Sequence, residues 1–179
     1  GVSAAIGFSQ KSNIPFELGI IRSHYVGRTF IEPSQTIRQF GVKLKHSVNK
    51  SCIENKKVIL IDDSIVRGTT ASKIVKMVYE AGAKEVHLGI SCPPILHPDF
   101  YGIDTPNYNQ LIASNSNLKK ITKLVGAKSL FFLSLAGTYK AMGCEERNSH
   151  TPQFTDHCFT GEYPIDVSEI LKLNRLKNE

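Results

Sequence analysis

The residue types best suited to chemistry are concentrated in one stretch of nine positions. It holds two carboxylates, three hydroxyl side chains and a glycine: Asp62, Asp63, Ser64, Thr69, Thr70 and Gly68. Backbone N–H groups in such a turn, at the start of a helix, form a cradle for an anion such as phosphate. Carboxylates beside that cradle suit a ligand that also carries hydroxyl groups or a divalent cation such as Mg²⁺. The stretch therefore predicts a site for a sugar phosphate.

Two other interpretations of this stretch explain less of it. A nucleoside-triphosphate loop of the G-x-x-x-x-G-K type is excluded because that motif is absent. An ordinary strand-to-helix turn with an aspartate cap accounts for one acidic residue. It does not account for two adjacent acids followed by three hydroxyls and a glycine.

The flanking sequence indicates which elements position the stretch. The β-branched run at 57–61 is typical of a parallel strand buried on both faces. A helix follows in which Ile74, Val75 and Val78 share one face, and Gly82 ends it. We expect further strands near 16–21, 86–90 and 129–133, and helices near 3–11, 118–125, 135–142 and 167–177. This alternation predicts an α/β fold with a parallel sheet flanked by helices, and Asp62 and Asp63 at its ligand-binding edge.

The basic residues are concentrated as well. The chain has 179 residues and a net charge of +6. Residues 22–50 carry six bases against the single acid Glu32, namely Arg22, Arg28, Arg38, Lys43, Lys45 and Lys50. This excess predicts an anionic ligand, with a solvated basic loop as the alternative. No stacking aromatics or nucleic-acid motif accompany it, so we expect no nucleic-acid partner.

Composition bounds the class of protein. A hydrophobic content of 41% rules out a disordered chain and suits a globular domain. No run of eighteen apolar residues and no leader pattern is present, so we expect neither a membrane span nor a signal peptide. The four cysteines form no C-x-x-C pair, which favours reduced thiols in a cytoplasmic protein. Because Gly1 opens a helix-like pattern, we expect the chain to start inside a larger protein.

The run Asp-Asp-Ser-Ile-Val-Arg-Gly-Thr-Thr at 62–70 resembles the phosphoribosyl-pyrophosphate (PRPP) motif of type I phosphoribosyltransferases. In this specific form it is similar to one family, the glutamine PRPP amidotransferases. Five other stretches agree with that family and extend the resemblance over nearly the whole chain: 25–31, 80–83, 100–104, 111–113 and 158–161.

The resemblance implies a glycosyltransferase of purine biosynthesis. In the family, ammonia taken from glutamine displaces pyrophosphate from PRPP to give 5-phosphoribosylamine. Asp62 and Asp63 would bind Mg²⁺ and the ribose hydroxyls. The 5′-phosphate would be held by Ser64, Arg67, Gly68, Thr69 and Thr70. The family also implies purine nucleotides as inhibitors and a homo-oligomer.

The basic segment would correspond to the family's flexible loop, which closes over PRPP and excludes water. Tyr25 and Arg28 match that loop and would be catalytic. The alternative for Arg28 and Lys45 is solvated surface charge. Residues 22–24 read Arg-Ser-His where the family usually has Lys-Asn-Arg, which would weaken closure of the loop.

Departures from the family pattern qualify the expected activity. We expect residues 1–142 to form a phosphoribosyltransferase domain without its first strand and pyrophosphate loop, and 143–179 to form an irregular C-terminal tail. The N-terminal glutaminase domain would be absent, leaving an incomplete fragment. Some members bind a [4Fe–4S] cluster; Cys158 matches one ligand, but Asp99 and Thr155 stand where two others would be, so we predict no cluster.

Two alternative functions stay open at this point. One is a different type I phosphoribosyltransferase, such as an enzyme of nucleotide salvage, which the extended family motifs and the tail argue against. The other is a non-catalytic PRPP-binding protein, acting as a sensor or as a decayed remnant of the enzyme.

Overall fold

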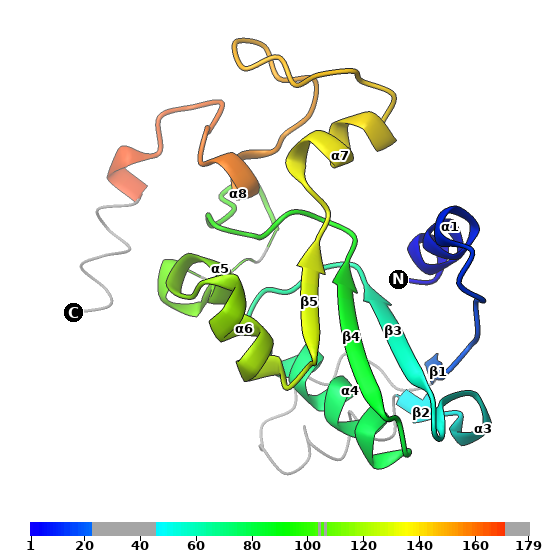
Figure 1. Cartoon of the computed structure of the whole chain (residues 1–179). Coiled ribbons are helices and arrows are strands. Elements are labelled where there is room, and N and C mark those ends of the chain that lie inside the picture. Colours follow the sequence, from blue (N-terminus) through cyan, green and yellow to red (C-terminus); the bar gives the residue numbers. More distant parts are fainter. Residues whose placement is uncertain (23–45, 104, 106, 171–179) are drawn as a thin grey trace.

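A computed structural model describes residues 1–22, 46–103, 105 and 107–170. Its centre is a three-stranded parallel sheet in the order β3 (Lys57–Asp62), β4 (Glu85–Ile90) and β5 (Ser129–Phe132) (Figure 1). The register pairs Asp62 with Ile90 and Gly89 with Phe131. The three strands therefore end at the same edge of the sheet. The α/β fold class expected from the sequence is confirmed.

Two helices cover one face of this sheet, α4 (Thr69–Glu80) and α6 (Leu118–Val125). Their apolar stripes pack against strand residues of alternate positions, and together they form the core. The most deeply buried members are Val75, Val78, Val86, Leu88, Ile90, Ile121 and Val125. Burying these branched side chains fixes where α4 starts, and with it the loop that follows β3.

Helix α6 shows why the local sequence forms these elements. The side chain of Asn117 caps its first turn by accepting a hydrogen bond from the Lys120 N–H at 2.9 Å. Gly126 ends the helix in the left-handed conformation, with φ of 77°. The predicted helix over 118–125 is thus confirmed at both ends.

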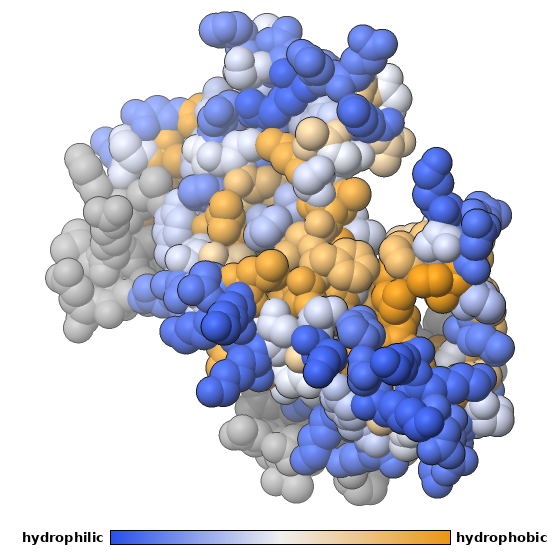
Figure 2. All heavy atoms as spheres, in the orientation of Figure 1, coloured by the Kyte–Doolittle hydropathy of each residue, from blue (hydrophilic) through white to orange (hydrophobic). Residues whose placement is uncertain are grey.

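The opposite face of the sheet is contacted by α1 (Val2–Ser12), which packs beside β3. The Phe8 ring stacks on Phe131 at a centroid distance of 6.1 Å. Figure 2 shows apolar side chains gathered over this face beside α1, and Val2, Ile6 and Phe131 are 40–57% exposed. The core therefore lies on the side of α4 and α6.

The remaining elements are short. A two-stranded antiparallel sheet joins β1 (Ile20–Arg22) to β2 (His46–Val48), followed by α3 (Lys50–Ile53). Beyond β4 come η2 (Tyr108–Gln110), α5 (Ile112–Asn115), α7 (Leu135–Ala141) and α8 (His157–Thr160). Figure 1 shows α5 and α8 near the end of the sheet at which β4 and β5 finish.

Two sequence expectations differ from the observed elements. The strand expected at 16–21 starts only at Ile20, because its partner β2 offers three residues and Phe16 and Leu18 stay exposed. Most of the helix expected at 167–177 falls outside the described residues. Within the described part of the chain, no helix is long and apolar enough to cross a membrane.

Candidate functional site

Two adjacent carboxylates stand at the carboxyl end of β3, as the sequence predicted. The strand itself lies at an edge of the described sheet and none of its residues is fully buried, so the prediction of a strand buried on both faces was wrong. Asp62 is the last residue of β3, and its Oδ1 accepts the Asp63 N–H at 3.0 Å. Asp63 Oδ1 accepts the Ser64 N–H at 2.9 Å. Ser91, just beyond β4, fixes this point by donating its N–H and its hydroxyl to the Asp62 carbonyl, at 3.0 and 3.1 Å. The backbone bearing both carboxylates is therefore held from the neighbouring strand.

The electrostatics of this pair favour a bound cation. Burial raises the pKa of Asp62, and the nearby Asp63 carboxylate adds to the rise. A positive ligand between them would relieve both effects. Among the described residues, no group of three or more His, Cys, Asp or Glu side chains is placed to hold a metal. Mg²⁺ needs no such group, because it is often held by one or two carboxylates with water and substrate phosphates completing its shell.

The loop after the carboxylates leads into the amino end of α4. Gly68 has φ of +78°, a conformation that glycine adopts without strain. A Cβ at this position would lie 2.8 Å from Ile112 Cδ1, so the site has no room for a side chain. Among the described residues, no side chain caps α4. The N–H groups of its first turn are thus available to an anion, and Thr69 and Thr70 lie exposed beside them.

The structure adds residues that the sequence pattern did not single out. The Arg67 Nε donates to Gln110 Oε1 at 2.9 Å. Burial raises the pKa of the Cys92 thiol to about 11, and the neighbouring Cys158, Asp63 and Asp62 add to the effect. Cys92, just beyond β4, therefore stays a protonated thiol. No local spacing in the sequence marks Gln110, Ser91 or Cys92, because each reaches the site from another element.

Part of the predicted site cannot be placed. Tyr25, Arg28 and Lys45 lie outside the described residues. The segment that carries them is flanked by β1 and β2, whose register pairs Arg22 with His46. The described residues on either side of it, Arg22 and His46, are therefore side by side.

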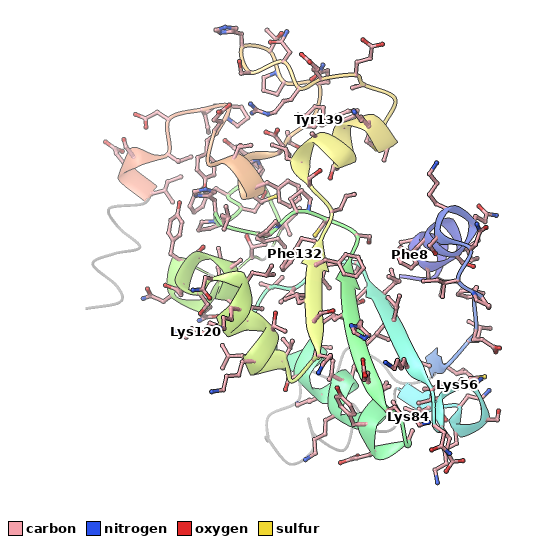
Figure 3. The ribbon with its side chains drawn as sticks, in the orientation of Figure 1. Phe8, Lys56, Lys84, Lys120, Phe132 and Tyr139 are labelled. Carbon is pink, nitrogen blue, oxygen red and sulfur yellow. The ribbon has the colours of Figure 1, made fainter. Side chains whose placement is uncertain are left out.

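A separate polar cluster lies in the late segment, the described residues 142–170 after α7. Asp156 accepts hydrogen bonds from Tyr139 Oη at 2.8 Å and from Arg147 Nε at 2.5 Å, and Arg147 also bonds Glu162. Burial opposes ionisation of Asp156, but the bonds from Arg147 and Tyr139 outweigh it and lower its pKa. Figure 3 places Tyr139 on α7, so this cluster holds the late segment against that helix.

His157 makes a second contact between the late segment and an earlier part of the chain. Its Nε2 lies 2.6 Å from Asp99 Oδ2, and both side chains are about 95% buried. Asp99 Oδ1 also accepts the N–H groups of Tyr101 and Ile103, at 2.8 and 3.0 Å. Burial works against ionisation of Asp99, but these bonds and His157 lower its pKa overall. The Tyr101 and Tyr163 rings pack against His157.

These contacts do not fit an iron–sulfur cluster at this place. A cluster is held by cysteine thiolates, whereas the Asp99 carboxylate is already committed to three donors and Thr155 has no sulfur. Burial raises the pKa of the Cys158 thiol, which keeps it protonated.

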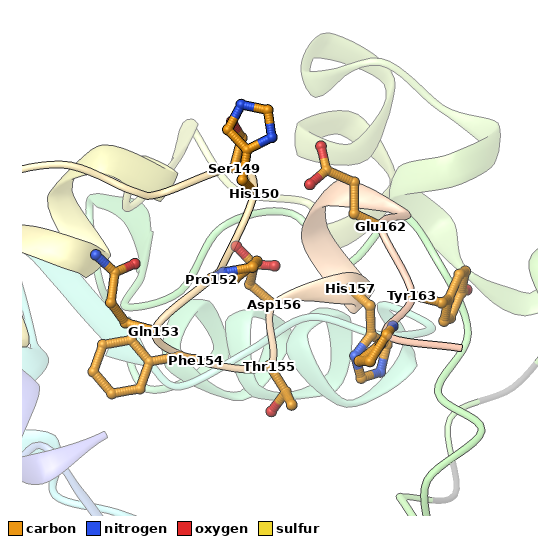
Figure 4. Close-up of a pocket in the computed structure, with 11 residues that line it drawn as sticks. Ser149, His150, Pro152, Gln153, Phe154, Thr155, Asp156, His157, Glu162 and Tyr163 are labelled. Carbon is orange, nitrogen blue, oxygen red and sulfur yellow. The ribbon is translucent and has the colours of Figure 1, made fainter. Parts of the chain in front are cut away.

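A cavity of about 420 Å³ lies in the same late segment (Figure 4). All of its lining residues fall between Ser149 and Pro164, and Asp156 and His157 are among them. It contains none of the residues between Asp62 and Thr70. The candidate sugar-phosphate site is therefore the open edge at β3 and α4.

Comparison with known proteins agrees with this geometry. No protein-family model matches the chain. The amidophosphoribosyltransferase of Rhizobium etli is 61% identical over 165 residues, which is 92% of this chain and 33% of that protein. The Bacillus subtilis amidophosphoribosyltransferase is 48% identical over 176 residues, 98% of this chain and 37% of that protein. The chain is homologous to part of the amidophosphoribosyltransferases. It spans about a third of the length of these relatives.

Solved structures of this family share the fold. The B. subtilis glutamine PRPP amidotransferase in complex with ADP and GMP superimposes with a TM-score of 0.80 and 49% identity, over 94% of this chain and 37% of that one. A second structure, described as the allosteric regulatory enzyme of purine biosynthesis, gives 0.81 and 48%, over 98% of this chain and 38% of that one. The resemblance stated from the sequence motifs is thereby confirmed.

Proposed function

We propose that the chain is the phosphoribosyltransferase part of an amidophosphoribosyltransferase, which transfers ammonia to PRPP and releases pyrophosphate and 5-phosphoribosylamine. The observation that carries this proposal is the edge formed by β3 and α4. Two carboxylates stand at the end of β3 and a short loop then leads to the start of α4, which has no side-chain cap among the described residues, on a chain 46–61% identical to enzymes of that name. The alternatives of a salvage phosphoribosyltransferase or a PRPP-binding protein have no comparable support.

The two halves of this edge would hold the two halves of the sugar phosphate. The 5′-phosphate would accept hydrogen bonds from the first-turn N–H groups of α4 and from Ser64, Thr69 and Thr70, with Arg67 supplying positive charge. Asp62 and Asp63 would accept hydrogen bonds from the ribose hydroxyls. As the bond to pyrophosphate breaks, the ribosyl carbon becomes positively charged, and these carboxylates would stabilise that charge.

Asp62 and Asp63 would also hold Mg²⁺, whose chemistry when bound is to neutralise the leaving pyrophosphate. The residues fit this ion because both donors are hard carboxylate oxygens. Burial raises the pKa of Asp62 and the Asp63 carboxylate adds to the rise, so a cation at this place would stabilise the ionised pair. Tyr25 and Arg28 would act from the segment between β1 and β2, which would exclude water while ammonia attacks.

Regulation and context follow from the same assignment. Because one solved relative is a complex with ADP and GMP, we infer that purine nucleotides inhibit the whole protein. A cytoplasmic location, a homo-oligomer, and the division into a domain at 1–142 and a tail at 143–179 stay predictions.

The proposal is tested by measuring pyrophosphate release from PRPP with ammonia and Mg²⁺, alongside PRPP binding by calorimetry. Turnover of PRPP by the chain supports the enzymatic proposal, and in that case Asp62→Asn/Asp63→Asn should lose at least about 100-fold in rate because the charge-stabilising groups are gone. Asp166→Asn, a change at an exposed aspartate far along the chain, is the control and should leave the rate unchanged. Binding of PRPP without turnover would favour the non-catalytic alternative.

A further inference from the structure

A short segment beyond β4 supports the loop that would hold the 5′-phosphate. The Ile112 N–H donates to the Val66 carbonyl at 2.9 Å. Two positions earlier, Gln110 Oε1 accepts the Arg67 Nε–H at 2.9 Å, across 43 residues of sequence. The Ile112 side chain fills the space at which a Cβ on Gly68 would clash. Three consecutive loop residues, 66–68, are thus held by η2 and α5.

The supporting segment is itself rigidly placed. Leu111 is fully buried, and it lies between Gln110 and Ile112. The Asn115 side chain donates to the carbonyls of Tyr108 and Leu111, at 2.6 and 2.9 Å. Burial of Leu111 and these bonds fix the backbone on both sides of Gln110. The side-chain amide can therefore hold Arg67 against a stationary support.

The hydrogen bond from Arg67 to Gln110 orients the Arg67 guanidinium and leaves its positive charge intact. A guanidinium carries five N–H donors, and Gln110 uses only the one on Nε. The paired Nη groups, which suit a phosphate, stay free of Gln110. Because an amide is neutral, the positive charge of Arg67 is kept; a carboxylate at position 110 would cancel it.

We propose that Gln110 is a positioning residue for the 5′-phosphate of a phosphorylated sugar, acting by holding the Arg67 guanidinium beside the start of α4. This inference rests on the proposed function of the β3–α4 edge. It names the part of the substrate that Gln110 controls, the 5′-phosphate and not the pyrophosphate. Losing Gln110 therefore weakens binding of the 5′-phosphate end of PRPP and leaves binding of the pyrophosphate end unchanged.

The experiment compares Gln110→Ala with the unmodified chain in binding ribose 5-phosphate and, separately, pyrophosphate with Mg²⁺. A single hydrogen bond to a charged group corresponds to a loss of about tenfold in affinity, and we expect that loss for ribose 5-phosphate and no change for pyrophosphate. Gln110→Glu should also weaken ribose 5-phosphate binding, because it neutralises Arg67. Asn109→Ala, at the exposed neighbouring position, is the matched control.

Kinetics give a second readout that a merely structural role would not move. With PRPP and ammonia, Gln110→Ala should raise KM for PRPP while kcat and the unfolding temperature stay close to those of the unmodified chain. Equal or tighter ribose 5-phosphate binding by Gln110→Ala overturns the inference, because Gln110 would then be holding Arg67 away from the ligand. Absence of ribose 5-phosphate binding by the unmodified chain overturns it as well. Selective loss of that binding in a chain that turns over no PRPP leaves the inference standing and refutes only the enzymatic proposal.

Discussion

Replacing Asp99 by alanine should destabilise the fold strongly, although Asp99 lies outside the candidate site. The change removes the partner of buried His157 and the acceptor of two backbone N–H groups, those of Tyr101 and Ile103. Leaving a buried polar group without its hydrogen-bond partner costs about 1–3 kcal/mol. Tyr101 and Ile103 are exposed, so water can replace their lost acceptor. Because the His157 and Asp99 side chains are both about 95% buried, we expect a loss near the upper limit of this range, about 3 kcal/mol.

The assay is thermal unfolding followed by circular dichroism near pH 7. For a domain of this length each kcal/mol shifts Tm by about 2–4 °C, so Asp99→Ala should unfold about 6–12 °C lower. Asp99→Asn should lose less, because its amide oxygen can still accept from Tyr101 and Ile103. Glu145→Ala, at an exposed acidic residue, is the control and should change stability by no more than about 0.5 kcal/mol.

The pH dependence gives a second check on the same contact. The pKa of Asp99 is lowered in the folded protein, so the carboxylate contributes stability above the ordinary value of 3.8 and loses it as the pH falls through the folded value. The deficit of Asp99→Ala should therefore be constant from pH 5 to 7 and shrink below pH 3.8. If Asp99→Ala unfolds within 1 °C of the unmodified chain, the buried pair does not hold the late segment and the reasoning is refuted.

Two further predictions concern the sheet and its ligand-binding edge. Asp62→Asn should raise Tm at pH 7 without ligand: burial raises the pKa of Asp62, so the ionised form costs stability above that pKa, and the gain should vanish below the ordinary value of 3.8. The absence of any gain at pH 7 would contradict the raised pKa. Gly89→Ala should lose about 1–3 kcal/mol in urea unfolding, because the new Cβ would lie 2.3 Å from Phe131 Cζ. Phe131→Leu in the same chain should recover part of that loss, and no recovery would mean that Phe131 is not the obstruction.

The local sequence pattern was enough to predict much of the fold. The β-branched run before Asp62 and the apolar stripe of α4 are formed by neighbours in sequence, so their periodicity was enough to place them. Asn117 and Gly126 mark the ends of α6 in the same way. The strand at 16–21 was overestimated because strand length depends on the partner, and β2 pairs only with Ile20–Arg22.

The candidate site likewise has a local part, which the sequence predicts, and contacts between distant residues, which it does not. The stretch from Asp62 to Thr70 is local, and the sequence alone determined its residue types, its place after a β-branched strand and its resemblance to a PRPP motif. Gln110 on Arg67 and His157 on Asp99 join residues 43 and 58 positions apart. No spacing rule connects residues so distant in the chain. Their meeting depends on the burial of Leu111 and on the contacts of the late segment with α7 and with the chain after β4, and only the tertiary structure decides these.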